Sequence, residues 1–133
     1  LAQGETAAGV REQTLRLYAS AGNNAANGLS QPEAADALYR AGIARAEAFL
    51  ACGENSTKIR EETLHLYANA GANASAALHH PEAADVLNRV GIARAEAFLA
   101  QGETAAGVRE QTLRLYLNAL ATSARLNQAD MMG

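Results

Sequence analysis

One stretch of this chain occurs twice without a single difference. Residues 1–18, LAQGETAAGVREQTLRLY, recur letter for letter at residues 99–116, and a diverged copy occupies residues 50–67. Successive copies are 49 residues apart, so the chain contains two and a half copies of one unit. Self-similarity at a fixed period is typical of repeat proteins, in which one supersecondary unit stacks on the next.

The second half of each unit has the pattern of a helix with defined ends. Pro32 and Pro81 stand at the start, where the missing proline N–H costs no intrahelical hydrogen bond. Gly53 and Gly102 follow the last apolar positions, where a left-handed residue is favoured. The pattern predicts two helices, from residue 32 to 50 or 51 and from residue 81 to 99 or 100.

Three features of these helices predict how they begin and pack. Ser30 and Glu33 have the spacing of a capping box, in which the serine side chain caps the helix. Gly42 and Gly91 cost about 1 kcal/mol relative to alanine, so we expect another helix to come close there. Small residues at helical spacing also form a row that we expect to be buried together with a bulkier row beside it; its members are Ala34, Ala37, Ala41, Ala44, Ala48 and Ala51.

The first half of each unit is a weaker helical pattern. We expect helices to start at good N-cap residues, which are Thr6, Asn55–Ser56 and Thr104. Beyond Tyr18, glycine and asparagine are frequent, and both are poor in helix interiors. The helix either continues to about Gly28 or breaks near Gly22 and Gly71 into a loop or a second short helix. Because the apolar rows keep their phase, we favour the continuous helix.

The chain is therefore expected to be all-α, with five helices in tandem antiparallel hairpins. Short connections make sequential helices antiparallel, which allows an open α-solenoid or an up-down helical bundle. We expect a single helical-repeat domain over residues 1–133, divided into units 1–49, 50–98 and a partial unit 99–133. In the partial unit, leucines replace small residues at positions 117 and 120, and we expect them to fill the space of an absent partner helix.

Composition excludes several classes of function. The formal net charge is −3 with both signs interspersed, so no basic stripe is available for nucleic acid. No apolar run approaches the roughly 20 residues that span a membrane. Cys52 is the only cysteine, which excludes an intrachain disulfide and favours a reducing, cytoplasmic location with a half-buried structural thiol. No signal peptide is visible, and a start at Leu1 without methionine indicates a processed, truncated or engineered terminus.

Catalytic and metal-binding patterns are weak. Glu62 and His65 form a Glu-x-x-His pair, which in di-metal helical bundles occurs twice, but the other copies have glutamine and arginine there. We therefore expect His65 to be exposed. His79 and His80 are adjacent in a connection and lack further ligands at a defining spacing, so a surface or capping role is expected. We expect no catalytic residue, no metal site and no cofactor, and hence no enzyme.

An asparagine-rich stretch has no evident core role. Ser20 and four asparagines give an uncharged polar face suited to hydrogen-bonded recognition; these asparagines are Asn24, Asn27, Asn69 and Asn73. Plain exposed helix surface is the interpretation that we favour over such a role.

The identical ends predict a second interaction surface. A surface that accepts residues 1–18 also accepts residues 99–116 of another molecule, which makes helix exchange and head-to-tail association feasible. The expected interface residues are Leu15, Leu17, Tyr18, Leu113, Leu115, Tyr116, Leu117 and Leu120. The exact copy beside a diverged one also indicates recent duplication or deliberate construction.

From these patterns we expect a non-catalytic helical-repeat scaffold that acts in self-assembly or protein–protein interaction. Its partner is expected to be itself, as a homo-oligomer or by helix exchange, or another protein. The alternative is a helical bundle that binds a small apolar ligand or a metal between its helices.

Overall fold

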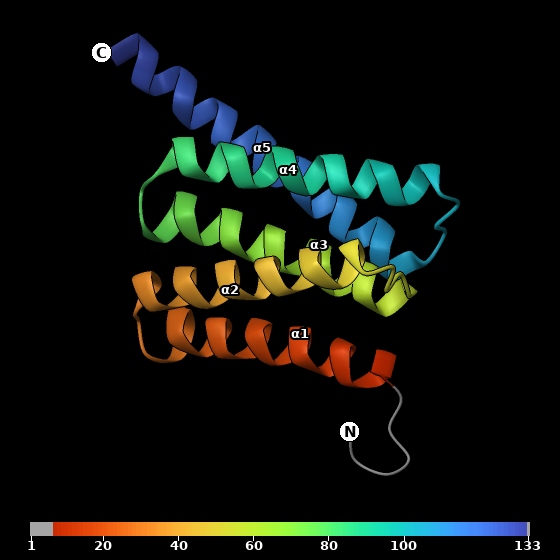
Figure 1. The fold of residues 1–133 in the computed structure, drawn as a ribbon. Helices are drawn as coiled ribbons and strands as arrows, with labels where there is room; N and C mark the ends of the chain where they lie inside the picture. Colours follow the sequence, from red (N-terminus) through yellow and green to blue (C-terminus); the bar gives the residue numbers. More distant parts are fainter. Residues whose placement is uncertain (1–6, 133) are drawn as a thin grey trace.

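The computed structural model describes the backbone of residues 7–132, and these residues form five α-helices and no strand (Figure 1). The all-α prediction and the order of the helices are confirmed. The helices are α1 (Ala7–Asn23), α2 (Pro32–Ala51), α3 (Thr57–Ala72), α4 (Pro81–Ala100) and α5 (Ala106–Met132). Thr6, the expected cap of the first helix, lies outside the described residues.

The ends of α2 and α4 fall where proline and glycine predict them. Pro32 and Pro81 open the two helices, and each helix is followed by a glycine in the left-handed region. The backbone φ is 87° at Gly53 and 94° at Gly102, conformations that residues with a Cβ rarely adopt. The capping box, in contrast, is wrong. Ser30 itself has a φ of 53° and makes no cap, because the residue before Pro32 takes the N-cap position.

The helical pattern of α1 and α3 continues through the asparagine-rich stretch. Gly22 and Gly71 lie within the helices, and each helix passes directly into a π-helical turn, over Asn24–Gly28 and Asn73–Ala77. The prediction of a continuous segment to about Gly28 is therefore confirmed.

The helices form an open array rather than a closed bundle. Sequential helices pack on one another, and α3 also contacts both α1 and α5. The outer helices α1 and α5 make at most marginal contact with each other, as do α2 and α4. Helices α1, α3 and α5 therefore form one layer, with α2 and α4 packed against it, and the C-terminal part of α5 projects beyond the array (Figure 1).

Glycine at the centre of α2 and α4 permits close packing, as predicted. A Cβ at Gly42 would lie 2.8 Å from Tyr18 Cβ, and a Cβ at Gly91 would lie 2.9 Å from Tyr67 Cβ. The same Gly91 Cβ would lie 2.8 Å from a terminal carbon of Leu115. Each of these helices thus lies against two helices of the other layer at its midpoint.

The alanine row of α2 is not buried, which corrects the sequence prediction. All six of its residues are exposed, namely Ala34, Ala37, Ala41, Ala44, Ala48 and Ala51. The buried residues of this helix instead include Ala35, Tyr39 and Ala46, on an adjacent stripe. Because α2 and α4 hardly touch each other, no described helix covers the alanine row.

Candidate functional site

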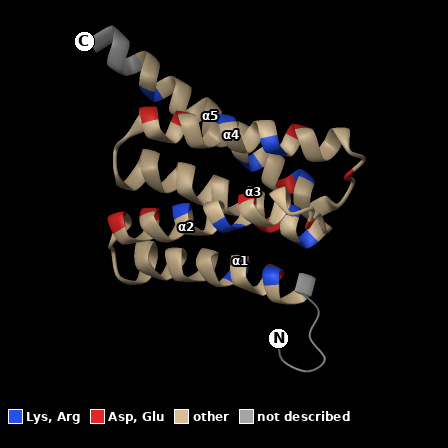
Figure 2. Ribbon diagram, viewed as in Figure 1, with Lys and Arg blue, Asp and Glu red and all other residues tan. Residues whose placement is uncertain are grey.

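The face of the array formed by α1, α3 and α5 contains a stretch almost free of charge. No Asp, Glu, Lys or Arg occurs at residues 17–32 or 63–81, which include the C-terminal parts of α1 and α3 (Figure 2). Five of the polar side chains in this region are asparagines, and the others are Ser, Thr, Tyr, Gln and His. Two clefts between α1 and α3 lie along this face.

The first cleft, which we call the asparagine cleft, has a volume of about 280 Å³. Four alanines form its apolar lining, and six polar side chains complete it: Asn23, Asn27, Tyr39, Asn69, Asn73 and Arg114. These side chains come from α1, α2, α3, α5 and the two π turns, so the cleft exists only in the assembled fold.

A hydrogen-bond network joins four helices beneath this cleft. The Tyr39 hydroxyl donates to Asn23 Oδ1 at 2.6 Å, and Asn69 Nδ2 donates to the same oxygen at 3.3 Å. Arg114 donates to Asn69 Oδ1 at 2.5 Å. Burial raises the pKa of Tyr39, an effect that nearby Arg114 partly offsets. Asn73 anchors the start of α2 separately, because its amide donates to the carbonyl of Pro32 at 2.9 Å.

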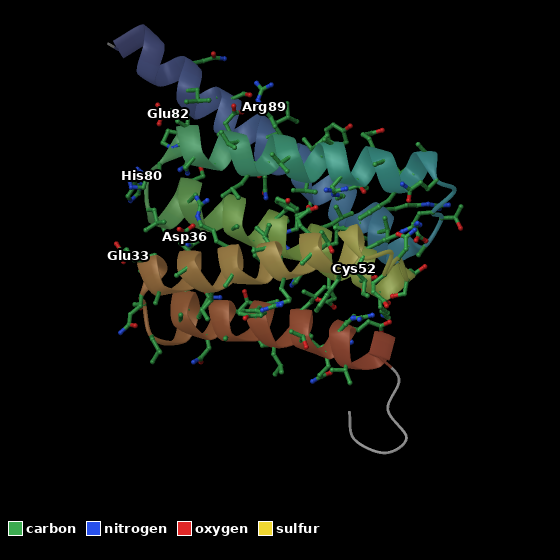
Figure 3. All side chains as sticks on the ribbon, in the orientation of Figure 1. Glu33, Asp36, Cys52, His80, Glu82 and Arg89 are labelled. Carbon is green, nitrogen blue, oxygen red and sulfur yellow. The ribbon has the colours of Figure 1, made fainter. Side chains whose placement is uncertain are left out.

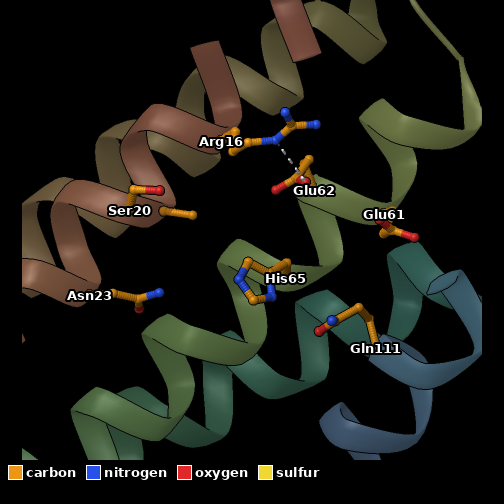
Figure 4. A pocket seen from close by; sticks show the side chains of 8 residues that line it. Arg16, Ser20, Asn23, Glu61, Glu62, His65 and Gln111 are labelled. Carbon is orange, nitrogen blue, oxygen red and sulfur yellow. Dashed lines mark ion pairs between the residues drawn. The ribbon is translucent and has the colours of Figure 1, made fainter. Parts of the chain in front are cut away.

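The second cleft adjoins the first at Asn23 and has a volume of about 270 Å³ (Figure 4). We call it the acidic cleft, because Glu61 and Glu62 line it together with Arg16 and His65. Arg16 and Glu62 are 4.0 Å apart, as the dashed line in Figure 4 marks. Burial raises the pKa of Glu62, an effect that His65 and Arg16 partly offset.

The structure separates the four asparagines predicted as a recognition face. Asn27, Asn69 and Asn73 line one cleft, whereas Asn24 is exposed outside it. Asn69 and Asn73 are only 6% and 8% exposed, so the favoured interpretation of plain exposed surface is wrong for them. Sequence reasoning did not include Asn23 in this set, although it lines both clefts. The signal for it is indirect, because the tyrosine that binds it crosses over Gly22.

His65 differs from its expected exposed position. It is half-buried, with Nε2 3.3 Å from Asn69 Nδ2 and Nδ1 3.4 Å from Arg114 Nη1. The equivalent positions in the other copies are occupied by Arg16, which is exposed, and Arg114, which is half-buried. The prediction treated the three positions as equal, but α3 lies between α1 and α5, whereas each outer helix has a neighbour in this layer on one side only.

The ends of the array expose large apolar side chains. On α1 and α2, a hollow is lined by Thr14, Leu17, Tyr18, Ala21 and Leu38, which we call the α1 end face. On α5, four side chains are between 42% and 69% exposed and form the α5 end face: Leu113, Tyr116, Leu117 and Leu120. Leu117 and Leu120 fill no internal space, contrary to the sequence prediction.

Two of the eight expected interface residues do not belong to either end face. Leu15 and Leu115 are 0% exposed and lie in the hydrophobic core. They cannot contact another molecule without unfolding of the helices around them. The other six residues of the expected interface are at least partly exposed and lie on the end faces.

Arginines at one repeat position pair with a glutamate of the unit that follows. Arg60 pairs with Glu103 at 3.0 Å and lies over the Phe98 ring, with its guanidinium carbon 5.3 Å from the ring centroid. Arg11 makes the equivalent contacts with Glu54 and Phe49 one unit earlier. Among the described residues, the third member of the series, Arg109, has no ion pair and is exposed.

The remaining candidate residues do not converge. Cys52 is exposed, not half-buried as predicted, and lies at the opposite end of the helices from His80 (Figure 3). Among the side chains that the structure describes, residues 9–127, no three His, Cys, Asp or Glu are grouped to hold a metal ion. Of the helices described, none is both long and apolar enough to cross a membrane. Comparison with family models, curated proteins and solved structures found no match for this chain.

Proposed function

We propose that this protein is a non-catalytic scaffold that binds an extended segment of another protein along the face of α1, α3 and α5. The observation that carries the proposal is the asparagine cleft, in which amide side chains from two helices meet in a hollow without any carboxylate. An asparagine amide offers both a donor and an acceptor, as does a peptide group, so it pairs with a backbone of any sequence.

Several polar atoms of the cleft are available for such pairing. Asn23 Nδ2, Asn73 Oδ1 and both amide atoms of Asn27 have no hydrogen-bond partner among the described residues. A polypeptide backbone in the cleft supplies the complementary groups. A ligand that covers these atoms without pairing them would leave buried polar groups unsatisfied, at a cost of about 1–3 kcal/mol each. A ligand without complementary groups is therefore disfavoured there.

The size of the two clefts also favours a polypeptide segment. From Arg16 in the acidic cleft to Asn27 in the asparagine cleft, α1 and its π turn rise by about 16 Å, at about 1.5 Å per residue. At about 3.3 Å per residue, an extended chain of about five residues covers that length. Each cleft by itself is slightly smaller than the roughly 300–1,000 Å³ of a typical small-molecule site.

Selection from a displayed library of random dodecapeptides tests this proposal, with binding of the enriched peptides measured by fluorescence anisotropy. We expect peptides with micromolar affinity that lose binding to the Ala76→Trp variant. Ala76 is an exposed wall residue of the asparagine cleft, so tryptophan there blocks the cleft without removing a buried contact. The matched control is Ala100→Trp, since Ala100 is exposed at the far end of α4.

The proposal is contradicted if no peptide is enriched, or if the enriched peptides bind Ala76→Trp and the unmodified chain equally well. Loss of binding to both tryptophan variants would place the contact outside the cleft and would also contradict it.

Self-association is a second candidate function, favoured by the two end faces. The α1 end face is a hollow lined mostly by carbon, and the α5 end face presents Leu113, Leu117 and Leu120. Inside the chain, the corresponding faces of α3 pack against α1 and α5 and are buried. A second copy stacked head to tail would supply the cover that the two end faces lack. Such a heterologous contact produces open chains of subunits.

Sedimentation velocity over a range of concentrations tests self-association. We expect mass to increase with concentration, and the double variant Leu117→Glu, Leu120→Glu to remain monomeric. Val86 on α4 is 60% exposed but lies on neither end face, so Val86→Glu is the control and is expected to associate normally. A concentration-independent monomer would remove this second candidate while leaving the first intact.

A further inference from the structure

Arg114 carries a positive charge and forms no ion pair with any acidic residue among those the structure describes. It donates to Asn69 Oδ1 at 2.5 Å and to Gln111 Oε1 at 3.5 Å, and its Nη1 lies 3.4 Å from His65 Nδ1. All three neighbours are side chains without a negative charge. Among the described residues, no Asp or Glu forms an ion pair with Arg114, although the guanidinium has five N–H donors.

The surroundings of Arg114 make this arrangement costly. Arg114 is half-buried beside a cleft whose other polar residues are four asparagines and a tyrosine. Burial lowers the pKa of Arg114 from its ordinary value, which reflects the cost of a charge removed from water. A buried charge is normally paired, because an uncompensated one destabilises the fold.

The same repeat position in α1 provides the comparison. Arg16 is aligned with Arg114, yet its side chain is 52% exposed and lies 4.0 Å from Glu62. Two residues of one type at one repeat position therefore differ in burial and in counter-charge. The more buried arginine is the one that lacks an acid.

We propose that Arg114 binds a carboxylate of the polypeptide segment that occupies the asparagine cleft and the adjoining acidic cleft, which together we call the groove. This inference rests on the proposed function, and it adds the chemical group that the ligand must carry. The guanidinium fork matches a carboxylate in geometry, and such charge-assisted pairs are about twice as strong as neutral hydrogen bonds. One guanidinium matches the single charge of a carboxylate better than the nearly double charge of a phosphate.

The position of the carboxylate along the groove follows from the charges at the two clefts. Glu61 and Glu62 line the acidic cleft and repel a carboxylate there. The asparagine cleft has no acidic residue in its lining, and its NH2 groups at Asn23 and Asn27 are unpaired donors. The carboxylate of a bound segment is therefore directed to the Arg114 end.

Three acetylated alanine-rich pentapeptides serve as probes in a nuclear magnetic resonance titration. The first has an amidated C-terminus and no carboxylate, the second is amidated and contains one aspartate, and the third has a free C-terminal carboxylate. We expect at least one of the two carboxylate peptides to bind about tenfold more tightly than the neutral one, a difference of about 1.4 kcal/mol. The better of the two identifies whether the group is a side chain or a chain end.

Substitution of the two aligned arginines distinguishes Arg114 from general charge effects. In Arg114→Gln the preference for carboxylate is expected to disappear, in Arg114→Lys to recover in part, and in Arg16→Gln to persist. A purely structural role predicts that Arg114→Gln destabilises the fold. We expect equal or higher stability instead, because the substitution removes an unbalanced half-buried charge.

The outcomes separate this inference from the function on which it rests. If all three peptides bind equally and shift the resonances of Asn27 and Asn69, the groove binds polypeptide but the carboxylate assignment is wrong. If the carboxylate preference survives in Arg114→Gln, the assignment is equally wrong. If no peptide shifts these resonances, both the inference and the proposed function are contradicted.

Discussion

Helices α1 and α5 are identical at aligned positions up to Tyr18 and Tyr116, yet they bury opposite leucines. In α1, Leu15 is fully buried and Leu17 is 60% exposed. In α5, the aligned Leu113 is 64% exposed and Leu115 is fully buried. Local sequence is identical over these positions, so the difference comes from the neighbouring helices alone.

Helix α3 explains the exchange, because it has neighbours on both sides. Its aligned residues Leu64 and Leu66 are both fully buried. One leucine row thus faces the unit that follows and the other faces the unit that precedes. The outer helices each lack one of these neighbours, so each exposes one row. In a repeat array the position in the stack determines burial, as expected when each unit contacts only its neighbours.

The largest expected effect is a difference in stability loss between alanine substitutions at aligned leucines. Leu115→Ala should lower the free energy of unfolding by about 2–5 kcal/mol, because it leaves a cavity in the core. Leu17→Ala, the aligned substitution, should change it by less than about 0.5 kcal/mol. In the other aligned pair, Leu15→Ala should cause the large loss and Leu113→Ala the small one. Denaturant unfolding measures all four, and comparable losses within either pair would contradict the assignment of burial.

The next effect compares arginines aligned along the three units. Arg60→Gln should cost about 1–3 kcal/mol, because Arg60 and Glu103 are 11% and 7% exposed and the carboxylate is left without its partner. Arg109→Gln should be close to neutral, since Arg109 is exposed and has no ion pair among the described residues. A neutral Arg60→Gln would show that the junction between units does not depend on this pair.

The pH dependence of stability sharpens the same comparison. Burial tends to raise the pKa of Glu103, but hydrogen bonds from the Ala105 N–H, Arg60 and Thr57 outweigh it, and the pKa is lowered overall. The charged form is thus favoured in the fold, so its stabilisation is present above the unfolded pKa of about 4.3 and is lost as the pH falls through the lower folded value. Glu103→Gln should flatten the acid limb of the stability profile. An unchanged acid limb in this variant would refute the assigned pKa shift.

A smaller effect is expected where α4 crosses the other layer. Gly91→Ala gains about 1 kcal/mol of helix propensity but forces Tyr67 and Leu115 apart, at a cost of about 1–3 kcal/mol. The net result should be a loss of about 1 kcal/mol. In a double-mutant cycle with Leu115→Ala, the double variant should lose less stability than the sum of the two single losses, because the shortened side chain at 115 makes room for the new methyl group. Strict additivity would show that the two residues do not touch.

The smallest effect concerns Glu62, which α1 and α5 replace by glutamine. Burial raises the pKa of this carboxyl, so the fold favours its protonated form, and the cost of ionisation is present at neutral pH and relieved as the pH falls. Glu62→Gln, which introduces the residue of the other two copies, should stabilise the protein at pH 7 by at most about 1 kcal/mol. The gain should vanish below about pH 4. A loss of stability at pH 7 would contradict the predicted sign.

Sequence predicts the helices of this protein better than it predicts their surfaces. The bounds of α2 and α4 follow from Pro32, Pro81 and the glycines behind them, because these residues act on the local backbone. The capping box fails because Ser30 adopts a left-handed conformation in a turn that the preceding π-helical turn determines. Local signals predict local geometry and lose their value where the geometry depends on a rare turn.

Surface predictions fail where burial depends on a neighbour that the periodicity does not identify. Hydrophobicity gives Leu15, Leu17 and Leu115 the same status, although only one of the three remains exposed in the fold. The asparagine cleft was partly predictable, since Asn69 and Asn73 are unusual residues for a helix interior. Asn23 and Arg114 could not be added, because the cleft forms from helices that are far apart in the sequence.

Thiol accessibility of the aligned leucine positions is the most direct measure of whether place in the stack decides burial. Single cysteines at positions 15, 17, 113 and 115 would be introduced into a Cys52→Ser background, because Cys52 is itself exposed. A maleimide reagent under native conditions should modify positions 17 and 113 at nearly the rate of a free thiol and should leave 15 and 115 protected. Equal rates at 17 and 115, or at 15 and 113, would contradict the account.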